Sequence, residues 1–125
     1  LGPDHPDTLR ARASLAISYT DAGRTTDAIT LQEGVLADFE RLLGPDHPDT
    51  LRARASLAIS YTDAGRTTDA ITLEEGVLAD RERLLGPDHP DTLNARHNLA
   101  ISYTDAGRTR EATALRERAF GDHDR

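Results

Sequence analysis

The chain has 125 residues, 37% of them hydrophobic, and carries a formal net charge of −7 because 22 acidic residues outnumber 15 basic residues. This acidic balance repels phosphate backbones and anionic membrane surfaces, so neither nucleic acid nor a membrane is expected as a partner. Cysteine is absent, which excludes disulfides, thiolate nucleophiles and cysteine metal sites. No apolar run reaches the roughly 20 residues that a membrane span needs, and no signal segment is visible, so a cytoplasmic location is expected.

One sequence unit occurs three times in the chain. The string LGPDHPDTL begins at Leu1, Leu43 and Leu85, so the period is 42 residues and the repeats are 1–42, 43–84 and 85–125. A period of this length predicts stacked supersecondary units. The first two copies differ only where Gln32 becomes Glu74 and Phe39 becomes Arg81. We expect a single repeat domain over residues 1–125. Because the sequence begins inside the repeat series, we also expect the chain to be a fragment of a longer parent protein.

Each repeat is expected to open with a helix that starts at a proline. Pro6 suits the first turn, and Asp4 or His5 is the expected N-cap. Apolar residues at three- and four-residue spacing then predict an amphipathic helix of about 16 residues, namely Leu9, Ala13, Leu15, Ala16, Tyr19 and Ala22. Gly23 is expected to end this helix in a left-handed cap.

A second helix follows in each repeat. Thr25 is its expected N-cap, and an apolar stripe runs to Gly44, formed by Ala28, Leu31, Val35, Phe39 and Leu42. Gly34 lies mid-helix, where glycine costs about 1 kcal/mol relative to alanine, so a close approach of a neighbouring helix is the expected compensation. Each repeat is therefore predicted to be an αα-hairpin.

The two ends of the series differ. The third repeat becomes more polar after Thr109, with Thr113 in the place of Ile71 and Arg118 in the place of Gly76, as a terminal repeat requires. The first repeat has the sequence of an internal copy, so its first helix should present a face that needs a cover. That face is a candidate surface for self-association, by end-to-end stacking, dimerisation or exchange of hairpins between chains.

The residues Leu15, Ala16, Tyr19, Gly23 and Ala28, with their equivalents in the other two copies, resemble the tetratricopeptide repeat signature. The longer period and the Leu-Gly-Pro-Asp-His-Pro-Asp linker resemble the variant found in kinesin light chains and in many bacterial multidomain proteins. The resemblance implies an all-α, right-handed superhelical solenoid of three helix-turn-helix repeats. It also implies a scaffold that binds a peptide or partner protein in a concave groove lined by the first helices. The arginine-only, alanine-rich composition is typical of a GC-rich bacterial genome.

Carrying the groove positions of that family onto this chain gives three similar rows. They are Arg10, Ser14, Ile17 and Asp21 in the first repeat, Arg52, Ser56, Ile59 and Asp63 in the second, and Asn94, His97, Asn98, Ile101 and Asp105 in the third. Neighbouring helices pack about 8–10 Å apart, and an extended peptide advances about 3.3 Å per residue. One row should therefore meet roughly every third ligand residue, which suits an extended or repetitive ligand.

Alternatives remain for several of these residues. Arg10 and Arg52, with Asn94 and Asn98, partly resemble a clamp for a peptide carboxylate, but solvated arginines that pair with neighbouring aspartates are favoured. The row of Tyr19 and its equivalents is assigned to interhelical packing ahead of ligand stacking.

The chain is expected to be neither an enzyme nor a cofactor protein. His5, His47 and His89 stand one repeat apart and cannot converge on one metal ion, so linker and capping roles are favoured. His97 is a candidate groove contact, and it lacks a serine or cysteine nucleophile nearby for a role as catalytic base. The turn from Asp21 to Arg24 is expected to hold a local ion pair.

Overall fold

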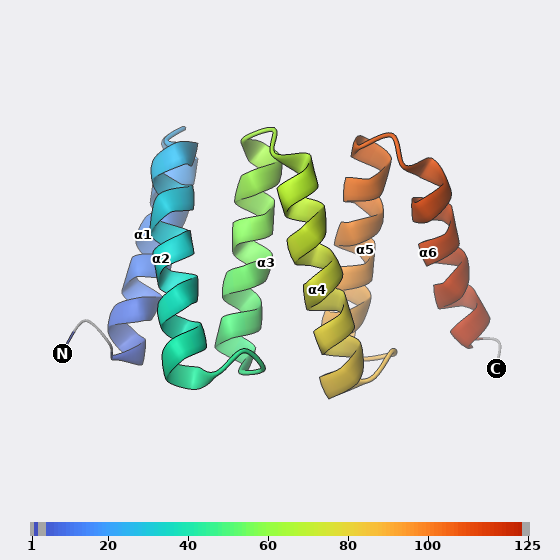
Figure 1. Ribbon diagram of the computed structural model, residues 1–125, viewed down its shortest axis with the longest axis horizontal. Coiled ribbons are helices and arrows are strands. Elements are labelled where there is room, and N and C mark those ends of the chain that lie inside the picture. The colour runs from blue at the N-terminus through green and yellow to red at the C-terminus, as the bar shows by residue number, and fades with distance from the viewer. Residues whose placement is uncertain (1, 3–4, 124–125) are drawn as a thin grey trace. The chain divides into compact units, whose positions relative to one another are not determined.

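The computed structural model describes residue 2 and residues 5–123, with side chains as far as Arg118. The described part of the chain is helical, without strands (Figure 1). Its helices are α1 (Pro6–Asp21), α2 (Thr25–Leu43), α3 (Pro48–Asp63), α4 (Thr67–Leu85), α5 (Pro90–Asp105) and α6 (Thr109–His123). None of the described helices is long and apolar enough to cross a membrane.

The helices group into two compact units, residues 1–66 and residues 67–125. In the first unit α2 packs against both α1 and α3, and in the second unit α5 packs against both α4 and α6. The division falls at the turn inside the second repeat, so the first unit holds one complete hairpin together with the first helix of the next.

Histidine caps start α1, α3 and α5. Nδ1 of His5 accepts a hydrogen bond of 3.1 Å from the backbone N–H of Asp7, and Pro6 occupies the first turn. His47 and His89 make the same bond at 3.1 Å and 3.0 Å. A side-chain acceptor satisfies one of the backbone N–H groups that a helix start leaves unpaired. The capping role of these histidines is confirmed, while Asp4 lies outside the described residues.

The expected turn after α1 is confirmed in its backbone. Gly23 has a φ of 77°, its N–H donates to the Thr20 carbonyl at 3.0 Å, and the N–H of Arg24 donates to the Tyr19 carbonyl at 2.7 Å. This pair of bonds is a Schellman motif, which needs a left-handed residue that glycine supplies without steric cost.

The side-chain expectations for this turn were wrong in two respects. Arg24 pairs with Asp27 at 2.8 Å, on the following helix, because its side chain lies over the Tyr19 ring and not back toward Asp21. Thr25 is already the first residue of α2, and the N-cap is Arg24, which makes no side-chain capping bond.

The core of the first unit is built on Leu9, Val35 and Phe39, whose side chains are almost fully buried. Partly buried apolar residues surround this cluster, namely Ala13, Leu31, Leu43 and Ala53. Leu42 was expected in this stripe but is 37% exposed. The apolar face of α2 ends at Leu43 instead, one position further round the helix.

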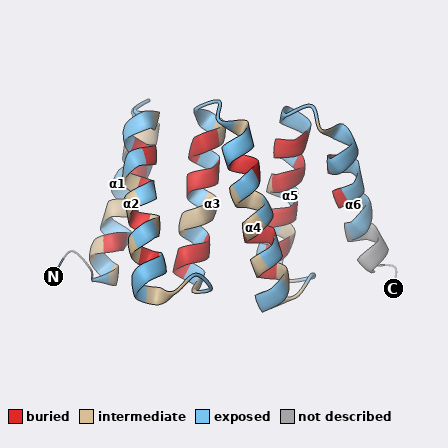
Figure 2. Cartoon of the chain, in the orientation of Figure 1, coloured by how far each residue is buried: buried red, intermediate tan, exposed pale blue. Residues whose placement is uncertain are grey.

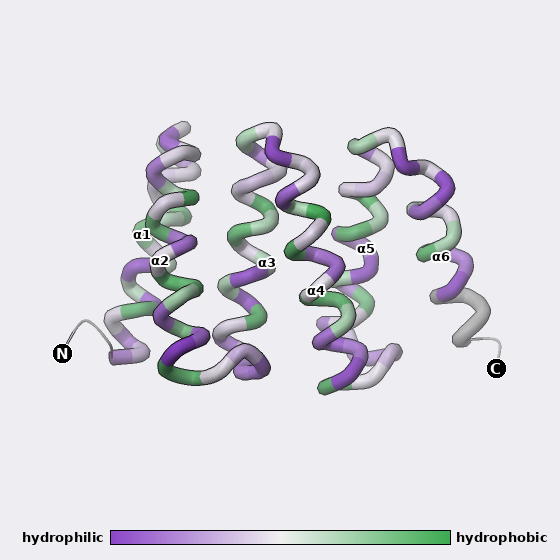
Figure 3. The backbone as a smooth tube through the Cα atoms, viewed as in Figure 1, coloured by the Kyte–Doolittle hydropathy of each residue, from purple (hydrophilic) through white to green (hydrophobic). Residues whose placement is uncertain are grey.

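All three helices of the second unit contribute to its core. Hydrophobic and hydrophilic residues alternate along these helices (Figure 3). The buried members are Ile71, Val77 and Leu78 of α4, Ala95, Leu99, Ala100 and Tyr103 of α5, and Ala112 and Leu115 of α6.

The absence of a side chain at Gly34 leaves space for the side chain of Arg12. A Cβ at this position would lie 3.2 Å from Nη2 of Arg12, and among the described residues no helix backbone approaches it as closely. The expected close helix approach is therefore wrong at Gly34. The guanidinium of Arg12 passes over the glycine and donates to Asp38 at 2.7 Å, which ties α1 to α2 and holds the pKa of Asp38 below its ordinary value.

The helices α1 and α3 have the same sequence but not the same burial (Figure 2). Leu15 on α1 is 46% exposed, whereas its equivalents Leu57 on α3 and Leu99 on α5 are 3% and 2% exposed. Leu99 packs in one cluster with Ile71 and Leu78 of α4. The side of α1 that carries Leu15 has no such preceding helix among the described residues.

Candidate functional site

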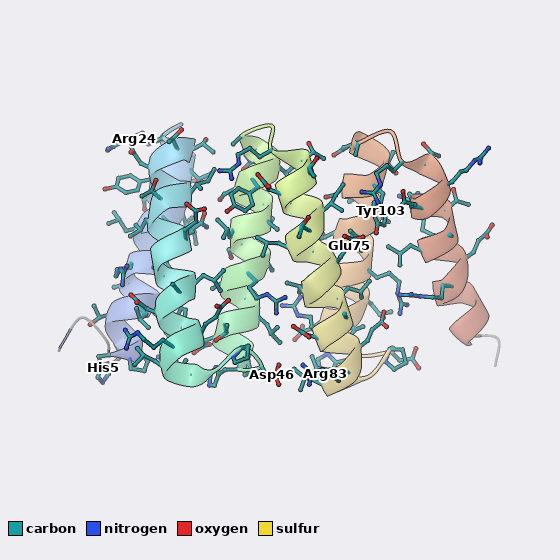
Figure 4. All side chains as sticks on the ribbon, in the orientation of Figure 1. His5, Arg24, Asp46, Glu75, Arg83 and Tyr103 are labelled. Atoms are coloured by element: carbon teal, nitrogen blue, oxygen red, sulfur yellow. The ribbon has the colours of Figure 1, made fainter. Side chains whose placement is uncertain are left out.

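Tyrosine and glutamate join consecutive hairpins. The hydroxyl of Tyr61 on α3 donates to Glu33 on α2 at 2.7 Å, and that of Tyr103 on α5 donates to Glu75 on α4 at 2.6 Å (Figure 4). Burial, together with the hydrogen bond to Glu75, raises the pKa of Tyr103 to about 12. These contacts confirm interhelical packing for the second and third tyrosines.

The structure places nearly all the predicted groove residues on exposed positions of the first helices. The exposed residues are Arg10, Ser14, Ile17 and Asp21 on α1, Arg52, Ser56, Ile59 and Asp63 on α3, and Asn94, His97, Ile101 and Asp105 on α5. Asn98 is half-buried. The isoleucines Ile17, Ile59 and Ile101 are 57%, 55% and 42% exposed. Each first helix therefore carries a large apolar side chain on its accessible side.

A hollow of about 320 Å³ lies in the first unit, bordered by all three helices. Its lining consists of Arg10, Ala13 and Ile17 of α1, Gln32, Val35 and Phe39 of α2, and Asp49, Arg52, Ala53 and Ser56 of α3. It brings together four of the predicted groove residues, while Ser14, Asp21, Ile59 and Asp63 do not line it. Sequence reasoning missed the α2 residues because it considered only first-helix positions, and it also missed Asp49 in the first turn of α3.

The rim of the hollow is a closed network of charges. Arg10 donates to Asp49 at 2.8 Å and to Asp7 at 3.0 Å, and Arg52 also donates to Asp49. Asp49 is buried, and the hydrogen bond from Arg10 holds the pKa of its carboxyl below the ordinary value. Each of the two arginines therefore has an aspartate partner, although of these aspartates only Asp49 lines the hollow. This geometry supports the pairing of the arginines with neighbouring aspartates over a clamp for a ligand carboxylate.

The floor of the hollow is apolar except for one amide. Val35 and Phe39 are 1% and 3% exposed. Gln32 is 7% exposed, and its Oε1 has no hydrogen-bond partner among the described residues.

The equivalent positions of the second repeat are occupied by charged residues that do have partners. Glu74 accepts a hydrogen bond of 2.6 Å from the hydroxyl of Ser102, and burial raises the pKa of its carboxyl. Arg81 is 9% exposed and donates to the backbone carbonyl of Asp91 at 3.4 Å.

In the described part of the second unit, the hollow lies away from the predicted groove residues. A smaller hollow of about 210 Å³ is lined by none of the predicted groove residues. It borders Glu82, to which Arg118 donates at 2.7 Å. No group of three or more histidine, aspartate and glutamate side chains among the described residues is placed to hold a metal ion.

Paired helices with a histidine cap at one end and a glycine turn at the other define an all-α helical-hairpin repeat protein. A family model described as tetratricopeptide repeat matches residues 7–81 and, in a second overlapping match, residues 57–121. The chain belongs to the tetratricopeptide repeat family.

Solved structures resemble the chain over nearly its whole length. The nearly identical tetratricopeptide-like repeats of a Podosopora anserina protein assigned to the kinesin light chains match with a TM-score of 0.92 and 31% identity, covering 99% of this chain and 59% of that one. BtubC from P. vanneervenii matches with a TM-score of 0.84 and 24% identity, covering 93% and 46%. The tetratricopeptide domain of Arabidopsis FLU matches with a TM-score of 0.75 and 19% identity, covering 93% and 94%.

The similarity to BtubC and to the FLU domain, at 24% and 19% identity, shows a shared fold alone. The chain spans less than two thirds of the length of the Podosopora anserina protein and of BtubC. No protein with a curated description matches it.

Proposed function

We propose that the chain binds an extended peptide segment of a partner protein on the exposed side of its first helices. Tetratricopeptide repeats generally mediate protein–protein interaction and are generally non-enzymatic. The observation that carries the proposal is the hollow of the first unit, which has an apolar floor and is bordered by the exposed Ile17 of α1.

The chemistry of this surface supports a peptide more than a folded partner. Exposed serine, arginine and isoleucine side chains alternate along α1 and α3, which gives each helix both hydrogen-bonding and apolar contacts. A recess of this size lies at the lower end of the range of about 300–1,000 Å³ for small-molecule sites, so it has room for a side chain of a peptide. A peptide running across α1 and α3 would insert a side chain there and leave the neighbouring side chains on the surface.

The test begins with selection of binding peptides from a displayed library of random dodecapeptides, followed by calorimetry on the selected sequences. Ser56→Arg fills the mouth of the hollow and should weaken binding at least tenfold. Thr30→Arg, an exposed change on α2 outside the hollow, is the matched control and should leave affinity within about twofold. Equal affinities for the two variants, or no selectable peptide, would refute the proposal.

A second candidate function is self-association through the outer side of α1. Its supporting observation is the 46% exposure of Leu15, whose equivalent Leu57 is 3% exposed in an identical helix. Light scattering over a range of concentrations tests it. A molar mass that climbs with concentration, and returns to one chain in Leu15→Glu, would support self-association, and a mass that stays at one chain would exclude it.

A further inference from the structure

The hollow of the first unit has features that specify its ligand more narrowly. Resting on the proposed function, we infer that it is a specificity site for a neutral apolar side chain of an extended peptide, and that the Gln32 amide pairs with the peptide group beside that side chain. Three independent observations lead to this assignment.

The first observation is where the repeats differ. The copies 1–42 and 43–84 are identical except at Gln32 and Phe39, which become Glu74 and Arg81. Both differing residues of the first copy line the hollow. The divergence between the two copies is therefore concentrated in one recess, and it replaces an amide and a phenyl ring with two charges.

The second observation is the state of Gln32. Gln32 is only 7% exposed, and its side-chain carbonyl oxygen has no hydrogen-bond partner among the described residues. A carboxamide offers both an acceptor and N–H donors, and a buried polar group without a partner is costly. A peptide group, with one N–H and one C=O, is its natural complement. Inside an α-helix both groups are already bonded, so Gln32 favours an extended segment.

The third observation is the charge of the surroundings. The guanidiniums of Arg10 and Arg52 are occupied by Asp7 and Asp49, so the rim offers no unpaired cation to a ligand carboxylate. The floor is formed by Val35, Phe39 and other apolar atoms. Because burial of an unpaired charge is expensive, this recess should reject acidic and basic side chains.

The second repeat supplies variants that the fold already accommodates. Glu74 is held by Ser102, and the equivalent serine of the second repeat, Ser60, is likewise buried. Gln32→Glu therefore introduces a residue for which a hydroxyl partner is available. Phe39→Arg introduces the residue that at position 81 donates to a backbone carbonyl. Both variants are expected to fold, which circular dichroism verifies before binding is measured.

The probes are capped pentapeptides, acetyl-Gly-Gly-X-Gly-Gly-amide, titrated into the ¹⁵N-labelled chain and followed by NMR. With X as leucine or phenylalanine, the side-chain amide signals of Gln32 should shift saturably. With X as aspartate, or with leucine N-methylated so that its amide cannot donate, the affinity should fall about tenfold or more.

Variants then separate this inference from the proposed function. Gln32→Glu and Phe39→Arg should each weaken the leucine peptide about tenfold, whereas the reciprocal controls Glu74→Gln and Arg81→Phe should change its affinity less than twofold. Shifts confined to Ser56 and other surface positions, with equal binding to Gln32→Glu, would overturn the inference while the proposed function stands. A failure of these pentapeptides and of the dodecapeptide library would overturn both.

Discussion

The pair Leu15 and Leu57 tests the packing scheme with an internal control. Both residues lie in the sequence RARASLAISY, in helices of identical length and composition, but Leu15 is 46% exposed and Leu57 is 3% exposed. The same substitution, leucine to alanine, therefore changes the same atoms in the same local context. Any difference between the two variants must come from tertiary burial.

The expected magnitudes follow from these exposures. Truncation of a buried leucine costs about 2–5 kcal/mol because transfer and cavity terms add. Leu57→Ala should therefore lower the free energy of unfolding by about 3 kcal/mol. At Leu15 about half of the transfer term remains, and an exposed site leaves no cavity, so Leu15→Ala should cost about 1 kcal/mol or less.

Urea unfolding provides the assay, followed by far-ultraviolet circular dichroism and by tyrosine fluorescence. Repeat proteins can unfold in parts, so the two signals must coincide before midpoints are converted to free energies. Equal losses for the two variants, or a larger loss for Leu15→Ala, would refute the burial of Leu57 on α3.

Three further predictions use the hydrogen bonds and titrating groups of the hairpins. Tyr61→Phe should cost about 1–2 kcal/mol in urea unfolding because it leaves a glutamate without its hydroxyl partner, while Tyr19→Phe should cost less than about 0.5 kcal/mol. His47→Ala removes the acceptor at the start of α3 and should cost about 1 kcal/mol by the same measurement. Burial raises the pKa of Glu74, so the Glu74 carboxyl holds its proton more tightly in the folded state than in the unfolded state. The contribution of Glu74 to stability therefore falls as the pH rises from the ordinary pKa through the raised pKa of the folded state. Glu74→Gln should therefore gain more stability at pH 7.5 than at pH 3.5, and a gain independent of pH would contradict the raised pKa.

The fold can be predicted from the sequence because proline and glycine residues mark where the first helices begin and end. A proline opens each first helix and a glycine with positive φ follows it, so the hairpins are delimited by backbone chemistry. The 42-residue period then fixes how often the hairpin recurs. Side-chain register was less predictable. Leu42 and Leu43 are equally apolar, and only the packed structure shows that Leu43 is the one that lies against the core.

The candidate site was only partly predictable. The exposed residues of the first helices follow from helical spacing, but the hollow depends on α2 residues whose distance from Arg10 and Arg52 is set by tertiary packing. The differences at Gln32 and Phe39 are visible in the sequence, and a seven-residue separation places both on one helical face. Nothing in the sequence shows that this face forms the floor of a recess, or that Asp49 closes the rim.

Chemical-shift mapping of the chain with a peptide selected from the dodecapeptide library tests the proposed peptide site. The backbone and side-chain signals of Ile17, Gln32, Phe39 and Ser56 should move together and saturate at one affinity. Shifts that instead gather on Leu15 and the outer side of α1, or on the exposed side of α2, would contradict a peptide site at the hollow of the first unit.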